Sequence, residues 1–102
     1  MLTSKQRAQL KALAAAEDTI LIVGKEGVTP GVVTQTAEAL RARELVKGRV
    51  LENSMLSARE ACEMLAERCR AEGVQCIGTK FVLYKRNETN PRIELVKSKK
   101  KK

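Results

Sequence analysis

The chain has 102 residues, with 20 Lys and Arg against 12 Asp and Glu, so its formal net charge is +8. This length predicts a single domain with its own core and excludes a two-domain enzyme. Apolar residues make up 43% of the chain, which is typical of a globular protein, and the excess positive charge predicts a polyanionic partner. We expect a cytoplasmic protein, because no apolar run is long enough to span a bilayer and the start lacks a secretory signal pattern.

Several residue types that enzymes and metal sites depend on are missing. The chain contains no His, so neither a Ser-His-Asp triad nor a Cys-His pair can be built, and the commonest metal ligand is absent. Three cysteines, Cys62, Cys69 and Cys76, are spaced by sevens without a C-x-x-C pair, and their odd number in a chain without a secretory signal indicates reduced thiols. Cys62 and Cys69 share one helical face and are expected in the core. The sequence therefore predicts no catalytic step, no cofactor and no metal.

The first third of the chain predicts a helix and then a strand. Thr3 and Gln6 have the spacing of a capping box, and apolar residues recur at helical spacing behind them, so a helix is expected over residues 4–16. The branched, apolar run 19–23 predicts a strand that is buried on both faces. We expect this strand at the centre of the sheet.

The middle of the chain predicts a second helix and a second strand. Thr29 is placed to cap a helix whose first residue is a proline, and this helix is expected to reach about residue 42. Residues 45–51 alternate in polarity, which predicts a strand with Lys47 and Arg49 side by side on one face.

A third helix and a hairpin are expected next. Ser57 and Glu60 form a second capping box, which predicts a helix over residues 58–72 that Gly73 terminates in the left-handed conformation. The pair Gly78-Thr79 suits a hairpin turn. The two strands that this turn joins are expected over residues 74–77 and 80–85.

The C-terminal end carries most of the excess charge. Residues 85–102 contain eight cations and two acids, which leaves a net charge of +2 for residues 1–84. Residues 91–96 alternate and are expected either to add an edge strand or to lie against the domain. We expect the folded domain to cover residues 1–96, and residues 97–102 to form a disordered, lysine-rich tail.

A glycine loop, Gly24-Lys25-Glu26-Gly27, connects the first strand to the second helix. The helix N-terminus behind it offers amides and a partial positive charge to a phosphate. A P-loop is excluded, because Val28-Thr29 follows where Lys-Ser/Thr is required, and the Rossmann fingerprint is broken as well. Two turn glycines without a ligand remain the alternative. Because aromatic residues are scarce, contact with a nucleic-acid backbone fits better than base stacking.

Four ordered blocks resemble the CRM domain, specifically the bacterial single-domain YhbY-type proteins, over about residues 3–86. They are Thr3-x-x-Gln6-x-x-x-Leu10-x-x-Leu13-Ala14, Val23-Gly24-Lys25-x-Gly27-Val28-Thr29, Glu44-Leu45-Val46-Lys47 and Gln75-x-Ile77-Gly78-x-x-x-Val82-Leu83-Tyr84-Lys85-Arg86. The resemblance implies a compact α/β domain of order αβαβαββ, in which a mixed sheet of about four strands packs with three helices. It also implies a similarity to the C-terminal domain of translation initiation factor three. Members bind RNA, and the bacterial ones associate with precursors of the large ribosomal subunit.

The resemblance also implies where RNA would bind. The expected contacts combine the glycine loop with basic positions of the later blocks and of the second strand: Gly24, Lys25, Glu26, Gly27, Lys47, Arg49, Lys85 and Arg86. Four more cations, Lys5, Arg7, Lys11 and Lys80, either extend this surface or form solvated faces. Two residues depart from the family pattern. Glu26 places an acid in the loop, and Gly48 stands where a branched residue is usual, so a bulge there could redirect Lys47 and Arg49.

The sequence thus predicts a monomeric ribosome assembly factor that binds ribosomal precursor RNA, with no membrane and no small-molecule substrate. Two alternatives stay open. One is a nucleotide-binding subdomain of an enzyme that uses the glycine loop. The other is a module that docks on an acidic protein partner.

Overall fold

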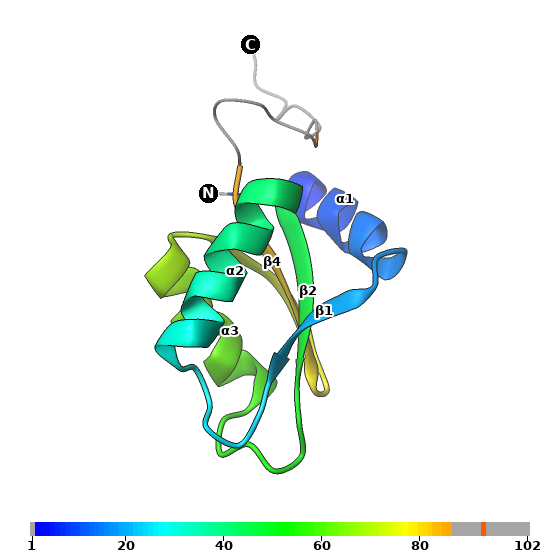
Figure 1. The fold of residues 1–102 in the computed structure, drawn as a ribbon. Helices are drawn as coiled ribbons and strands as arrows, with labels where there is room; N and C mark the ends of the chain where they lie inside the picture. The colour runs from blue at the N-terminus through cyan, green and yellow to red at the C-terminus, as the bar shows by residue number, and fades with distance from the viewer. Residues whose placement is uncertain (1, 87–92, 94–102) are drawn as a thin grey trace.

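The structure is a computed structural model, and it describes residues 2–86 and 93. Within these residues the chain forms three helices and four strands in the order αβαβαββ, as expected (Figure 1). The elements are α1 (Ser4–Ala15), β1 (Thr19–Val23), α2 (Pro30–Arg43), β2 (Leu45–Val50), α3 (Ala58–Cys69), β3 (Glu72–Ile77) and β4 (Lys80–Tyr84).

The four strands form one mixed sheet in the order β1-β2-β4-β3. β1 runs parallel to β2, while β4 pairs antiparallel with both β2 and β3. The prediction that β1 lies at the centre was wrong, because the β3–β4 hairpin pairs on the far side of β2 and leaves β1 at an edge. The prediction that β1 is buried on both faces was wrong as well. Leu21 and Val23 are buried, but Ile22 between them is 49% exposed.

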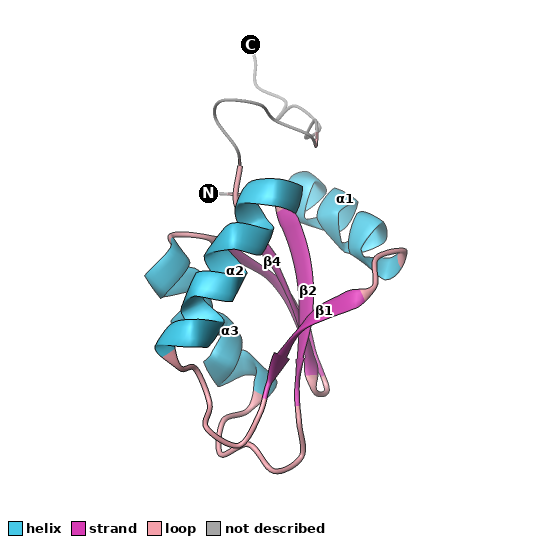
Figure 2. Ribbon diagram, viewed as in Figure 1, coloured by secondary structure: helices cyan, strands magenta, loops and turns pink. Residues whose placement is uncertain are grey.

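The two faces of the sheet are covered unequally. Figure 2 shows α2 and α3 together on one side of the sheet and α1 on the other. Under α2 and α3 lies the larger apolar cluster, which includes Leu21, Leu40, Val46, Leu65 and Phe81, and we call this side the closed face. A smaller cluster lies under α1, and we call that side the α1 face.

The caps that fix the helix starts are those expected from the sequence. The amide of Gln6 donates to Thr3 Oγ1 at 3.1 Å, and the amide of Thr3 donates to Gln6 Oε1 at 3.1 Å. Ser57 and Glu60 form the same reciprocal pair at the start of α3. Each box satisfies amides that the first helical turn leaves without a partner.

The end of α3 differs from the prediction. The helix stops at Cys69, and Arg70 takes the left-handed cap with a φ of 57°, so Gly73 is not the terminator. Gly73 lies inside β3 instead, where a Cβ would stand 3.2 Å from Cys62 Sγ. This glycine therefore allows β3 to pass close to α3, which is a packing requirement that helix periodicity does not reveal.

Gly48 also has a packing role. A Cβ at this position would lie 2.5 Å from the ring carbon Cζ of Phe81, so the phenylalanine ring occupies the space of a side chain. The expected irregularity is present, but it falls on the neighbouring strand, where the register shifts between Thr19 and Leu21. Lys47 and Arg49 keep their expected common face, and the alternating burial of β2 confirms it.

The predictions for the C-terminal end fall almost wholly outside the described residues. These are the strand over 91–96 and the tail over 97–102. Ile93 is described, and its side chain packs against the smaller cluster under α1. Its amide donates to Glu44 Oε1 at 2.7 Å.

Candidate nucleic-acid interface

The glycine loop is a tight turn with an exposed tip. The amide of Gly27 donates to the carbonyl oxygen of Gly24 at 3.0 Å, and this bond leaves Lys25 and Glu26 exposed at the tip. Gly27 itself is buried with a φ of +75°, and a Cβ there would stand 3.3 Å from Leu56 Cδ1. Both the backbone angle and the close contact require glycine at this position.

Three connections meet at one end of the sheet, which we call the loop end. The amide of Leu51 donates to the Val23 carbonyl at 2.9 Å, so the chain after β2 leaves the sheet beside the glycine loop. The amide of Val50 donates to the Thr79 carbonyl at 2.8 Å, which holds the hairpin turn at the same end. In Figure 1 the glycine loop and the connection after β2 lie at the bottom of the molecule, and the yellow hairpin turn lies above them to the right.

The N-terminus of α2 offers fewer amides to a phosphate than the sequence led us to expect. Pro30 has no amide proton, and the amide of Val32 donates to Thr29 Oγ1 at 3.2 Å. Of the first three helical positions, only Gly31 keeps an amide without a partner in the described part of the chain. The loop amides of Lys25 and Glu26 have no partner among the same residues. An anion at this end would therefore meet the loop backbone together with Gly31.

A row of four side chains crosses the α1 face next to the loop end. Ile22 pairs with Arg49, Arg49 with Lys80, and Lys80 with Ile77, so the row contains one residue from each strand. All four are exposed, with 49% of Ile22 and 63% of Ile77 accessible. We call these residues the exposed row. Directly opposed like charges destabilise a strand pair, so the Arg49–Lys80 pair does not serve the stability of the sheet.

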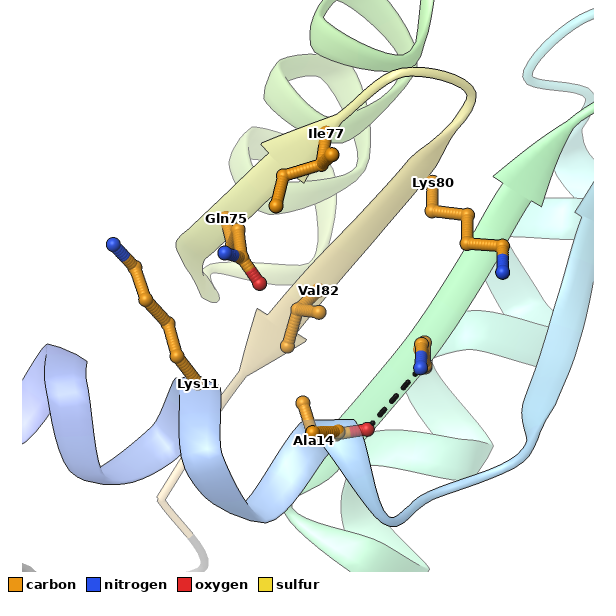
Figure 3. A pocket seen from close by; sticks show the side chains of 8 residues that line it. Lys11, Ala14, Gln75, Ile77, Lys80 and Val82 are labelled. Atoms are coloured by element: carbon orange, nitrogen blue, oxygen red, sulfur yellow. Dashed lines mark hydrogen bonds between the residues drawn. The ribbon is translucent and has the colours of Figure 1, made fainter.

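A hollow of about 350 Å³ lies between this row and α1, and we call it the sheet groove. It is lined by Lys11, Ala14, Ala15, Lys47, Gln75, Ile77, Lys80 and Val82, which include three cations and no acid. In Figure 3 the side chains of Gln75 and Val82 lie between Lys11 on α1 and Lys80 on β4. Three of the predicted RNA-contacting cations, Lys11, Lys47 and Lys80, thus meet around one apolar floor.

Lys47 also ties the helix to the sheet. Its ammonium donates to the carbonyl oxygen of Ala14 at 3.3 Å, marked by the dashed line in Figure 3. A cation at a helix C-terminus pairs with the last carbonyls and with the negative end of the helix dipole. Lys47 is half-buried. Because its ammonium already donates to this carbonyl, it is less available to an external anion than an exposed lysine.

Four of the remaining predicted cations lie elsewhere. The guanidinium of Arg7 donates from Nη1 to the carbonyl oxygens of Gly73 and Val74, which anchors α1 to β3. Lys5 is exposed in the first turn of α1. Lys85 and Arg86 follow β4 at the opposite end of the sheet, about 16 Å along the strand from Lys80. The structure therefore separates these two from the glycine loop.

Raised pKa values occur in the two apolar cores. Burial, together with neighbouring Cys76, raises the pKa of the Cys62 thiol to about 12. Burial also raises the pKa of Cys69 and of Tyr84, the latter helped by the nearby Glu44. Reactive thiols need a lowered pKa, so Cys62 and Cys69 are packing residues, as predicted.

The sequence reasoning missed Gln75, Ile77 and Ile22 as surface partners of the cations. The hairpin sequence could have revealed Gln75 and Ile77. With a two-residue turn, Ile77 must pair with Lys80, and strand alternation then puts Gln75 and Val82 on the same face. Ile22 could not be found this way, because its exposure depends on the edge position of β1.

Comparison with known proteins decides the family. The model of the CRS1 / YhbY (CRM) domain matches residues 2–85. The chain belongs to the CRM domain family. "Probable RNA-binding protein YqeI" of Bacillus subtilis is 43% identical over 95 residues, which cover 93% of this chain and 99% of that protein. "RNA-binding protein" of Haemophilus influenzae is 31% identical over 87 residues, or 85% of this chain and 88% of its own length.

A solved structure agrees with the CRM fold. Protein SAV1595 of Staphylococcus aureus is 40% identical, and its solution structure superposes with a TM-score of 0.79 over 94% of this chain and all of the other. The family and the compact fold predicted from the sequence are therefore confirmed. The similarity to initiation factor three stays a prediction.

The described residues of this CRM domain offer neither a metal site nor a membrane span. Residues 2–86 and 93 hold no cluster of three or more His, Cys, Asp and Glu side chains that could bind a metal ion. Among the same residues, no helix has the length and apolar character that a membrane crossing needs.

Proposed function

We propose that this CRM domain is a cytoplasmic ribosome assembly factor that binds precursor RNA of the large ribosomal subunit. The glycine loop holds the RNA backbone, and the neighbouring cations attract it. No catalytic step is needed for this role. The relatives reported above are named for RNA binding, and the restriction to ribosomal precursors is the further step that we propose.

The observation that carries the proposal is the geometry of the loop end. Lys25 projects from a turn whose tip amides have no partner in the described part of the chain, and both tip residues, Lys25 and Glu26, are exposed. The tip amides can therefore donate to a phosphate, while the Lys25 ammonium supplies the charge. Glu26 is equally exposed, so its carboxylate can turn toward solvent.

Charge-swapped loop variants test this proposal without disturbing the core. A side chain at Gly27 would be strained, whereas Lys25 and Glu26 are exposed and carry no structural bond among the described residues. Lys25→Glu should weaken binding to large-subunit precursor RNA, and Glu26→Lys should strengthen it, because phosphate contacts dominate such affinities. Arg59→Glu, at an exposed site on α3, serves as the control for net charge.

The same experiment separates the alternatives. Co-sedimentation with ribosomal precursor particles should fall in Lys25→Glu and persist in the control. Equal RNA binding by Lys25→Glu and Glu26→Lys would contradict the proposal. Saturable calorimetric titration with ATP, GTP or NAD would favour a nucleotide site instead, and tighter binding to an acidic protein than to RNA would favour a docking module.

A further inference from the structure

We propose that the sheet groove and the exposed row form a second RNA subsite, which takes an unpaired nucleotide next to the backbone held by the glycine loop. This inference rests on the proposed RNA binding and names the kind of RNA: a strand with accessible bases. It assigns RNA binding to the part of the α1 face that α1 does not cover, which the proposed role of the glycine loop does not involve.

The groove and the exposed row carry positive charge that is uncompensated in the described part of the chain. Lys11, Arg49 and Lys80 form no salt bridge within the described residues, and no acid lines the groove. Arg49 and Lys80 stand directly opposite each other on adjacent strands, which destabilises the strand pair unless an anion lies between them. The charge of the groove therefore fits a phosphate. It also disfavours the lysine-rich C-terminal residues of this chain as the occupant.

The floor of the groove is apolar and carries one polar side chain. Ile77 and Val82 offer an apolar surface, and the side-chain amide of Gln75 has no hydrogen-bond partner in the described part of the chain. An amide both donates and accepts, which matches the edge of a nucleobase. A hollow of about 350 Å³ with one free amide and peripheral cations suits one base with its phosphate. A paired base inside a duplex cannot enter it.

The exposed row lies close to the glycine loop. The exposed row lies one residue before the ends of β1 and β2, and those ends lead into the glycine loop and the residue 51–57 connection. The hairpin turn is held beside the end of β2 by the bond between Val50 and Thr79. One strand of RNA can thus run from the loop across the end of the sheet into the groove without crossing a helix.

The test compares two RNAs and two double variants. Fluorescence anisotropy would measure the affinity of the full chain for a short unpaired oligonucleotide and for a blunt duplex of the same composition. Arg49→Ala/Lys80→Ala removes two cations of the row. Arg59→Ala/Arg68→Ala removes two exposed cations of α3, on the other side of the sheet, and changes the net charge equally. Circular dichroism would confirm that each variant is folded.

We expect the row variant to bind the unpaired RNA at least about tenfold more weakly, with a smaller loss for the duplex. The slope of log affinity against log salt should flatten by about 0.7 for each phosphate contact removed. Gln75→Glu should also weaken binding to the unpaired RNA, because a carboxylate cannot donate to the base edge and adds a negative charge to a groove that holds a phosphate. The α3 variant should stay close to the unmodified protein.

The outcomes distinguish this inference from the proposed function. If the unmodified chain binds neither RNA, both fail. If Lys25→Glu weakens binding while the row variant matches the α3 control, RNA binding stands and the subsite is refuted. An equal loss for duplex and unpaired RNA would also refute it. A change of oligomeric state in the row variant, measured by light scattering, would refute the subsite as well. Binding of polyglutamate, and not of RNA, at the groove would also refute it.

Discussion

The two faces of the sheet contain neighbouring residues of the same strands, yet they are covered to different extents. On the closed face, α2 and α3 cover a cluster that includes Val46, Leu83 and Phe81 and that is apolar throughout. On the α1 face, one helix covers only part of the sheet, and Arg49 and Lys80 stand exposed next to each other. In β2 the two faces alternate residue by residue. The comparison predicts that, with RNA bound on the α1 face as proposed, stability and binding can be changed separately on this sheet.

The largest expected effect is on the closed face. Gly48→Val would place side-chain atoms where the ring of Phe81 already lies, 2.5 Å from the position of a Cβ. Overpacking of this kind costs about 1–3 kcal/mol, so the free energy of unfolding should fall by that amount in urea denaturation. Arg49→Val, the same new residue on the opposite face, is the control. A Gly48→Val protein as stable as the unmodified one would contradict the packing of the closed face.

Alkaline pH should also weaken the closed face. The pKa of Cys62 is raised from 9.0 to about 12, so the folded state holds its proton where the unfolded state has lost it. Its contribution to stability is complete below pH 9.0 and is lost as the pH rises toward about 12. The free energy of unfolding should then fall by up to about 1.4 kcal/mol per pH unit. Cys62→Ala should show a shallower decline, and an equal decline would contradict the burial of this thiol.

A substitution in the glycine loop should lower the free energy of unfolding less than one on the closed face. Gly27→Ala forces a side chain into a left-handed conformation at a φ of +75° and against Leu56. We expect a loss of about 1 kcal/mol in thermal or urea unfolding. Gly24→Ala is the matched control, because a Cβ there would meet Leu51 Cδ1 at an ordinary 3.7 Å. Equal losses in both variants would show that the backbone angle is not the cause.

The smallest effect on stability, with the opposite sign, is expected on the α1 face. Lys80→Ala removes one member of the like-charged pair with Arg49, so stability should rise by about 0.2–1 kcal/mol while RNA affinity falls. Urea unfolding and RNA titration of the same preparation measure the two quantities. A loss of stability together with affinity would mean that Lys80 contributes to folding and would remove the contrast between the faces.

Local signals made much of this fold predictable. The caps at Thr3, Thr29 and Ser57 depend on residues three positions apart, and all three start their helices as expected. The hairpin register follows from the Gly78-Thr79 turn, because two residues leave no other pairing for Ile77 and Lys80. Features determined within a few residues are thus readable from the sequence.

Features that depend on distant partners were not readable. The apolar run 19–23 predicts a central strand, but the position of β1 depends on where the later hairpin pairs. The role of Gly48 depends on Phe81, more than thirty residues away, and that of Gly73 depends on Cys62. The free amides of the candidate site were overestimated for a different reason. Pro30 and the Thr29 cap were both recognised, and together they remove two of the first three amides of α2.

The most direct test of the central claim is a map of amide chemical shifts during titration of the labelled protein with an unpaired RNA. The glycine loop and the open α1 face should respond together. We therefore predict large shifts at Lys25, Glu26, Gly31, Arg49, Gln75 and Lys80, and small shifts along α3. Shifts concentrated on α3, or on the loop alone with Arg49, Gln75 and Lys80 unchanged, would contradict the claim.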